Sequence, residues 1–267
     1  MRRVLQGVTV ALATSLTGCA GAPLVRPTQP AAPPRNATLA EVRAAYDGYC
    51  QRLDTLSASG DLDVRDLRTG KSQKLGVRLV AARGGRLYLK GSVAIVTALE
   101  VSSDGRRFWF MVPSKKTVWT GVSDAAPASE RADAPYYALR PADLVQALLP
   151  EALQPGEGDT LVLESDRRAF ALSQVPAAGG ALRRRVTLER ESLLPVRIQS
   201  FDASGELVSS VSLGAWQDGA PRQVSLERPV EGYLASFSLD KLTRNGAAPE
   251  RAFQGRTPEG YKVVEVQ

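Results

Sequence analysis

The chain contains a long series of short segments in which apolar and polar residues alternate. A period of two is typical of strands with one buried face and one exposed face. Leu75, Val77 and Leu79 alternate with more polar neighbours, and Leu87 and Leu89 do so in the next segment. The pattern predicts strands over residues 60–67, 73–82, 86–90, 107–112, 117–119, 161–163, 169–172, 184–188, 195–201, 207–213, 223–227 and 235–239.

Turn residues separate many of these segments. Ser103-Asp104-Gly105 and Asp202-Ala203-Ser204-Gly205 have the composition of hairpin turns. Arg68-Thr69-Gly70-Lys71 and Pro113-Ser114-Lys115-Lys116 also predict turns. The segment 107–112 is apolar on both faces, which predicts a central strand. Strands joined by tight turns pair antiparallel, so we expect a mostly antiparallel sheet.

Two helices are expected beside the strands. Thr38-Leu39-Ala40-Glu41 is a capping box, and apolar residues follow at spacings of three and four as far as Leu53. Pro141 suits a first helical turn, apolar residues follow it, and Pro150 ends the second helix. Many short strands with two helices predict a mostly β (α+β) fold in which the sheet curls over the helices.

The N-terminus predicts export. Arg2 and Arg3 precede the uncharged, apolar stretch 4–16, which is too short to span a bilayer. Leu16-Thr17-Gly18-Cys19 resembles the lipobox of bacterial lipoproteins, in which the cysteine receives a diacylglyceryl group. Residues 1–18 are therefore expected to be a lipoprotein signal peptide, and lipidated Cys19 a membrane anchor. The alternative is an ordinary signal peptide that contains a cysteine.

The segment after Cys19 predicts a spacer and then one domain. Closely spaced prolines between Pro23 and Pro34 exclude a helix or a central strand, so residues 19–37 are expected to form an extended tether. Residues 38–267 suit one large β-rich domain. Ala20 replaces the aspartate that retains Gram-negative lipoproteins at the inner membrane. This resemblance implies an outer-membrane anchor with the domain facing the periplasm.

The composition argues against an enzyme. The chain has no histidine, and its only cysteines are Cys19 and Cys50. Nucleophile–histidine arrangements are thereby excluded, and the commonest transition-metal ligand is missing. Catalysis by carboxylates alone stays open, but no acidic pair stands out from turn residues such as Asp104 and Asp202. We expect no catalytic residues, metal, cofactor or nucleic-acid partner, and a buried, unreactive thiol at Cys50.

The order of the segments carries a resemblance. It comprises the amphipathic helix, the strand Arg86-Leu87-Tyr88-Leu89-Lys90-Gly91, Ser103-Asp104-Gly105 followed by Phe108-Trp109-Phe110 and Pro113, Leu194-Pro195-Val196-Arg197 followed by Asp202 and Gly205, and a closing strand with Phe253 and Pro258-Glu259-Gly260-Tyr261. This series covers most of the mature chain. It resembles the LolA/LolB superfamily of lipoprotein localisation factors and the outer-membrane lipoproteins that share their fold.

The resemblance implies an incomplete antiparallel β-barrel, closed by helices, with an apolar interior that takes acyl chains of lipids or lipoproteins. A periplasmic carrier protein would then be a further partner. The alternative is that the interior is a filled core. The residues expected to line the interior are Val42, Tyr46, Leu75, Val77, Leu79, Leu87, Leu89, Phe108 and Phe110.

The uncharged segment 91–99 is expected to have a role of its own. It falls where LolB-like proteins carry a protruding loop, so the resemblance implies that Val93 or Ile95 touches the membrane. The alternative is a strand or a buried cover. Two functions follow as hypotheses: a factor that handles lipids or lipoproteins, and an accessory envelope lipoprotein that uses the same fold to bind a protein partner.

Overall fold

The computed structural model describes residues 35–125 and 135–266, which belong to a compact unit running from Pro34 to Gln267. Cys19, the signal peptide predicted over residues 1–18 and most of the tether predicted over 19–37 lie outside the described residues. Within the described ranges, every helix is too short or too polar to cross a bilayer.

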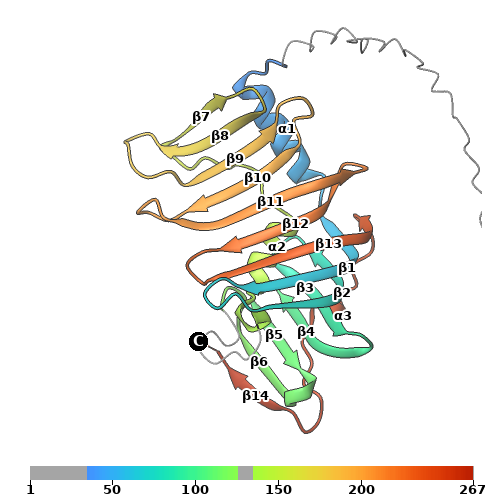
Figure 1. Cartoon of the computed structure of the whole chain (residues 1–267). Coiled ribbons are helices and arrows are strands. Elements are labelled where there is room, and N and C mark those ends of the chain that lie inside the picture. The colour runs from blue at the N-terminus through green and yellow to red at the C-terminus, as the bar shows by residue number, and fades with distance from the viewer. Residues whose placement is uncertain (1–34, 126–134, 267) are drawn as a thin grey trace, which may run out of the picture. The chain divides into compact units, whose positions relative to one another are not determined.

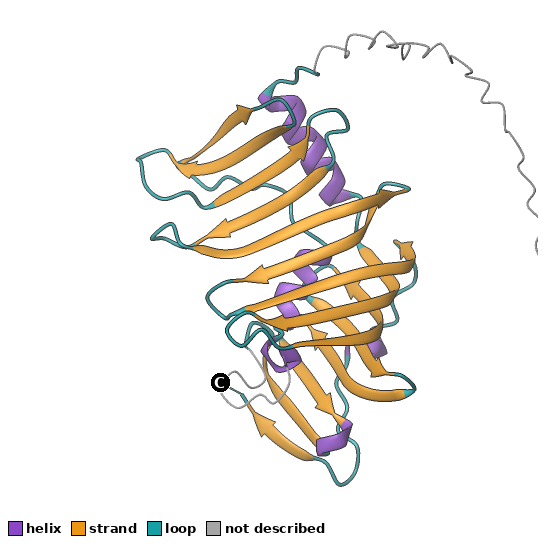
Figure 2. Ribbon diagram, viewed as in Figure 1, coloured by secondary structure: helices purple, strands orange, loops and turns teal. Residues whose placement is uncertain are grey.

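The domain is built on one sheet of 14 strands (Figure 2). The spatial order is β14-β6-β5-β4-β3-β2-β1-β13-β12-β11-β10-β9-β8-β7. The strands are β1 (Thr55–Asp66), β2 (Ser72–Ala82), β3 (Arg86–Val93), β4 (Val96–Asp104), β5 (Arg107–Val112), β6 (Thr117–Val122), β7 (Asp159–Ser165), β8 (Ala169–Pro176), β9 (Arg184–Glu189), β10 (Pro195–Phe201), β11 (Leu207–Gln217), β12 (Ala220–Arg228), β13 (Tyr233–Arg244) and β14 (Lys262–Glu265).

Two antiparallel meanders make up this sheet, and β1 joins them by pairing with β13. Leu56 lies opposite Arg244, so the central pairing connects residues far apart in the sequence. The pairing of β14 with β6 is parallel. The sheet does not close, because β7 and β14 are its two edges. The predicted mostly β fold with an incomplete antiparallel barrel is thus confirmed.

Helices lie against the sheet (Figure 1). Helix α1 (Leu39–Gln51) begins at the predicted capping box, since Thr38 and Glu41 exchange the expected hydrogen bonds. Helix α2 (Pro141–Leu148) has Pro141 in its first turn. α1 contacts β8, and α2 contacts β12 and β2 to β4. The shorter helical segments are η1 (Pro113–Lys115), η2 (Pro135–Ala138) and α3 (Glu250–Phe253).

The core lies between the helices and one face of the sheet. Apolar residues at alternate positions of the strands and the buried side chains of α1 and α2 belong to one hydrophobic cluster. Cys50, on the buried face of α1, is 1% exposed. Burial raises the pKa of its thiol to about 11, so the thiol stays protonated at neutral pH.

The C-terminal segment covers part of the opposite face of the sheet. Arg256 pairs with Glu100 at 3.1 Å, and Gly255 packs directly against the Trp109 ring. Glu100 and Trp109 occupy strand positions that alternate with the core residues Val101 and Phe108. This cover explains why the strand predicted to be central is largely buried on both faces.

The predicted closing strand around residues 253–261 is wrong in position. Phe253 ends α3, and the backbone N–H of Tyr261 donates to the carbonyl of Pro258 in a turn. Pro258 has no N–H, and Gly260 has a φ of 77°, so neither residue suits a strand interior. The strand begins only at Lys262.

Candidate functional site

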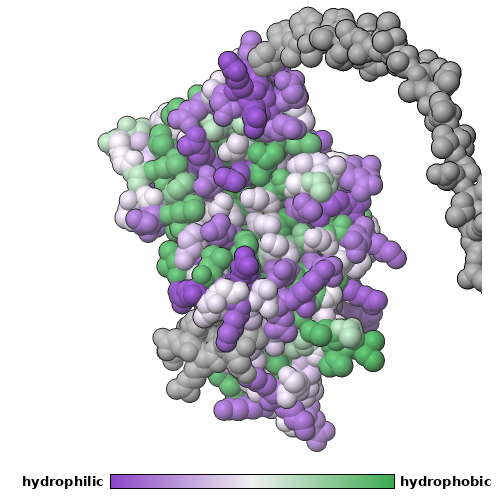
Figure 3. All heavy atoms as spheres, viewed as in Figure 1, coloured by the Kyte–Doolittle hydropathy of each residue, from purple (hydrophilic) through white to green (hydrophobic). Residues whose placement is uncertain are grey.

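The β3–β4 hairpin ends in an apolar tip, which we define as Val93, Ala94, Ile95 and Val96. The exposed fractions of Val93, Ile95 and Val96 are 48%, 98% and 67%. Apolar surface is visible where this hairpin ends (Figure 3). Segment 91–99 therefore forms two strand ends and a turn, and its turn residues face solvent instead of covering the core.

The composition of this tip is unusual for a hairpin turn. Tight turns favour Gly, Asn or Asp, because these residues tolerate a positive φ. Here Ala94 takes a φ of 52° and Ile95 follows it, fully in water. A turn made of the usual Gly, Asn or Asp residues would be at least as stable and would expose less apolar surface. Contiguous exposed apolar residues of this kind mark protein or membrane contacts.

The structure brings the predicted interior residues together. All nine are between 0% and 4% exposed and belong to the single core cluster. Seven lie on β2, β3 and β5, and the other two, Val42 and Tyr46, lie on α1. Seven of the nine have 0% exposure, so no water-sized space adjoins those seven side chains. Their role in lining a lipid cavity stays a prediction.

Tyr46 also has a polar anchor. Its hydroxyl donates to the carbonyl of Glu151 at 2.9 Å and accepts a hydrogen bond from the guanidinium of Arg184 at 2.9 Å. Burial raises the pKa of Tyr46 well above its usual value. The hydroxyl thus fixes α1 to β9 and to the segment that follows α2.

Arg83, in the turn between β2 and β3, holds the ends of both helices. Its Nη1 donates to the carbonyls of Leu149 and Pro150 at 3.1 and 3.0 Å, and its Nη2 donates to the carbonyl of Cys50. The last carbonyls of a helix have no partner within the helix, and a cation there is also favoured by the helix dipole. One side chain therefore joins the C-terminal ends of α1 and α2 to the sheet.

A buried ionic network holds the other end of α2. Arg228 pairs with Asp143 at 3.3 Å and with Glu231 at 2.6 Å, and Arg140 pairs with Glu231 at 2.9 Å. The hydroxyl of Tyr233 donates to Asp143 at 3.2 Å. Burial raises the pKa of Asp143, although Arg228 and Arg140 oppose that effect. The network ties the first turn of α2 to the turn between β12 and β13.

Sequence patterns do not reveal Arg83 or this network. The carbonyls that Arg83 binds belong to residues 33 or more positions away, and no motif surrounds it. Asp143 lies in the predicted second helix, where an acidic residue in the first turn is ordinary. Only the tertiary fold brings these groups together.

Comparison with known proteins supports the fold. No protein-family model and no curated protein sequence matches the chain. Among solved structures, a LolA superfamily protein from Nitrosomonas europaea is 12% identical, with a TM-score of 0.52 over 82% of this chain and 99% of that one. A DUF1329 family protein from Desulfovibrio piger is 17% identical, with a TM-score of 0.51 over 80% of this chain and 97% of that one.

Sequence identities this low are evidence of a shared fold and not of a shared activity. The similarity spans nearly the whole of both solved chains. The expected resemblance is confirmed at the level of structure: the chain has the fold of the LolA superfamily.

Proposed function

We propose that this chain is a lipid-anchored factor of the bacterial envelope that binds acyl chains of lipids or lipoproteins in its apolar interior and helps to localise or transfer them. Cys19 would carry the anchor at the outer membrane, with residues 19–37 as the tether and residues 38–267 as the working domain facing the periplasm. A periplasmic carrier protein would deliver the acylated cargo.

The observation that carries the proposal is the exposed apolar tip on a LolA-like sheet. An anchored domain stays beside a bilayer, where Val93, Ile95 and Val96 can leave water for lipid. Fully burying a side chain of this kind contributes about 1.5–3 kcal/mol. The tip therefore supplies a weak, reversible membrane contact next to a core that is apolar enough for acyl chains.

Cargo binding requires the interior to open. The predicted lining residues pack closely, so an acyl chain can enter only if α1 or α2 moves away from the sheet. Each buried CH₂ of the chain contributes about 0.8 kcal/mol, which offsets the cost of that movement over several carbons. The Arg83 hydrogen bonds to both helix ends are among the contacts that must break for this movement.

Native mass spectrometry of the chain without residues 1–19 tests the proposal. All the core residues lie within the compact unit from Pro34 to Gln267, so this form keeps the whole core. The probe is a synthetic diacylated lipopeptide, and its unacylated peptide is the control. We expect a one-to-one complex with the lipopeptide alone. Equal binding of both probes, or of neither, would refute acyl-chain binding.

The closed packing also favours a second candidate, an accessory lipoprotein that binds a protein partner. Strand β7 is an edge of the sheet, with Val162 41% exposed and its outer backbone groups unpaired within the described residues. Such an edge can accept a strand from another chain. A lipopeptide that fails to bind, together with slower amide exchange in β7 in the presence of an envelope protein fraction, would favour this candidate.

A further inference from the structure

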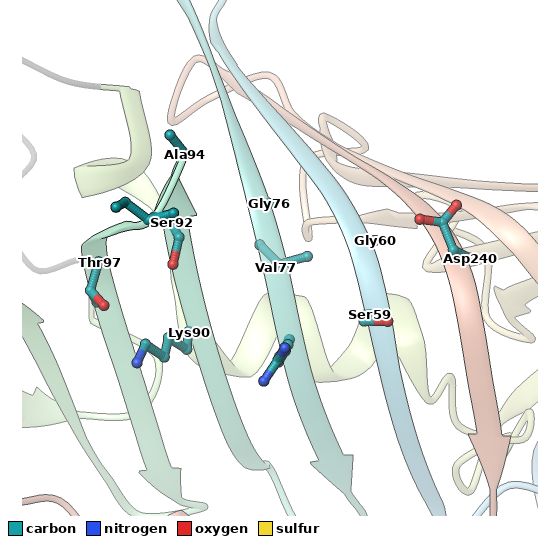
Figure 4. Close-up of a pocket in the computed structure, with 11 residues that line it drawn as sticks. Ser59, Gly60, Gly76, Val77, Lys90, Ser92, Ala94, Thr97 and Asp240 are labelled. Atoms are coloured by element: carbon teal, nitrogen blue, oxygen red, sulfur yellow. The ribbon is translucent and has the colours of Figure 1, made fainter.

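A polar groove of about 450 Å³ lies beside the apolar tip, on the face of the sheet opposite the core. Figure 4 shows its wall, with Lys90 and Ser92 on β3, Thr97 on β4 and Asp240 on β13. Gly76 of β2 and Gly60 of β1 lie between them without side chains. Arg78 and Ile95 also line the groove, and because Ile95 belongs to the tip, the groove is continuous with the tip.

Gly76 keeps this groove open, and the backbone does not require a glycine there. Its φ is not in the left-handed region, and a Cβ added to it would meet no atom closer than 3.8 Å. A glycine in the middle of a strand is unfavourable and often marks a site where another group approaches closely. Gly60 differs, because a Cβ there would lie 2.0 Å from the carbonyl oxygen of Ser238.

Two cations face the groove without partners. Arg78 lies directly opposite Lys90 across β2 and β3, an arrangement that costs stability because like charges repel. Neither side chain makes a hydrogen bond or ion pair with a described residue. Two of the nearby acids have ion pairs of their own. Asp61 pairs with Lys74 at 2.8 Å, and Glu100, which lies directly opposite Lys90 on β4, pairs with Arg256 at 3.1 Å. An anion in the groove would relieve the repulsion.

The depth of these cations below the tip matches a lipid head group. Lys90 precedes Val93 by three residues of β3, which corresponds to about 10 Å along a strand. An interfacial apolar segment enters the head-group and acyl boundary by about 5–10 Å. When the tip enters the hydrocarbon, Lys90 and Arg78 therefore lie at the level of the phosphates.

We propose that the groove around Gly76 is a subsite for the phosphate of an anionic phospholipid head group, bound by Arg78 and Lys90 while the apolar tip is in the bilayer. This inference rests on the membrane contact within the proposed function. Ser92 and Thr97 supply hydroxyl donors on the side of the tip. Asp240 stands across β1, about two strand spacings or 10 Å from Arg78, where its charge opposes anion binding.

Vesicle co-sedimentation of the chain without residues 1–19 tests the subsite. The vesicles are phosphatidylcholine with and without phosphatidylglycerol. We expect the double variant Arg78→Gln, Lys90→Gln to lose affinity for the anionic vesicles by about fivefold for each charge removed. Its affinity for neutral vesicles should stay unchanged, and Asp240→Asn should bind the anionic vesicles more tightly.

Two further variants distinguish a specific phosphate subsite from general attraction of anionic vesicles by surface cations. Arg167→Gln with Arg197→Gln removes two exposed cations elsewhere and should have little effect. Gly76→Leu fills the groove with no change of charge and should lower affinity for anionic vesicles, with an unchanged melting temperature as the folding control. The subsite is overturned if Gly76→Leu binds like the wild type, or if the control pair loses as much affinity as the groove pair.

The outcome is independent of cargo binding. The positions varied here, Gly76, Arg78, Lys90 and Asp240, alternate with core residues along their strands, so these variants should still bind the diacylated lipopeptide. If the wild type binds anionic vesicles with the expected variant pattern but takes no lipopeptide, the subsite stands and acyl-chain binding fails. A wild type that binds neither kind of vesicle overturns the subsite. Lipopeptide binding by itself then decides whether the proposed acyl-chain binding holds.

Discussion

The guanidinium of Arg83 donates to the carbonyl of Leu149 at 3.1 Å, and through this contact the turn between β2 and β3 holds the end of α2. The same side chain reaches Cys50 at the end of α1. We predict that Arg83→Leu lowers the free energy of unfolding by about 2–4 kcal/mol, because several charged hydrogen bonds disappear together. Chemical denaturation measures this loss.

The reactivity of the Cys50 thiol reports whether α1 detaches from the sheet more often in Arg83→Leu than in the wild type. In a chain without residues 1–19 this thiol is the only one, and it is buried in α1. Reaction with a thiol reagent should be slow in the wild type and faster in Arg83→Leu. Arg65→Leu, at an exposed arginine of β1, is the matched control and should change neither measurement. Equal labelling rates in all three proteins would show that Arg83 does not hold α1.

Introducing a charged side chain into the apolar tip tests whether the tip contacts the membrane. We predict that Ile95→Glu, alone or with Val93→Glu, abolishes vesicle binding and lipoprotein delivery. For Ile95→Glu alone, the free energy of unfolding should change by no more than about 0.5 kcal/mol, because the side chain of Ile95 is 98% exposed and contributes little to the fold. Co-sedimentation measures vesicle binding, transfer of a labelled lipopeptide to vesicles measures delivery, and thermal unfolding measures stability.

The control for the tip is Val162→Glu on the edge strand β7, where the wild-type valine is also exposed. It should bind vesicles as well as the wild type does. A large loss of stability in Ile95→Glu would mean that the tip belongs to the core, and undiminished vesicle binding would mean that the tip does not touch the membrane.

Asp143 should make stability depend on pH in an unusual direction. Burial raises its folded-state pKa above the ordinary value of 3.8, so the folded chain binds this proton more tightly than the unfolded chain does. Its contribution to stability is therefore greatest below pH 3.8, falls as pH rises towards the folded-state pKa, and is level above it.

Asp143→Asn keeps the shape and the ability to accept hydrogen bonds but cannot titrate. We expect the stability of the wild type relative to this variant to fall as pH rises from 3 through the acidic range. Urea denaturation of both proteins at a series of pH values measures the difference. A difference that grows with pH would mean that Arg228 lowers the pKa of Asp143 by more than burial raises it.

The C-terminal cover makes a further prediction at Gly255. A Cβ at this position would lie 1.8 Å from an atom of the Trp109 ring, so Gly255→Ala must push the segment off the sheet. We expect a loss of about 1–3 kcal/mol, as for other overpacked sites. Gly76→Ala is the matched control, since it adds the same methyl group in open space and should cost nothing. Equal stabilities of the two variants would show that the cover is not firmly packed.

Local patterns accounted for most of the strands and for the start of α1. Alternation, Asp–Gly turns and the Thr38–Glu41 capping box act over a few residues, so they are readable without the fold. The end of β13 was missed, because its last residues, from Asp240 to Arg244, are mostly polar and resemble a loop. The tip stayed ambiguous because its turn contains no turn-forming residue.

Long-range features could not be predicted from the sequence, for a different reason. The pairing of β1 with β13, the passage of residues 254–261 over Trp109 and the contacts of Arg83 all join distant parts of the chain. No local periodicity encodes such partners. The groove around Gly76 is similar, since each of its strands looks ordinary alone and only the register places Arg78 opposite Lys90.

The position of β1 in the middle of the sheet also sets an order of assembly. β1 is among the first strands to emerge during synthesis, yet one of its two neighbours, β13, is among the last. Until residue 244 is available, the first meander has a long open edge, and such edges recruit other chains. Pairing over such separations is slow. The sheet can therefore be completed only after β13 has been synthesised, when nearly the whole chain is available.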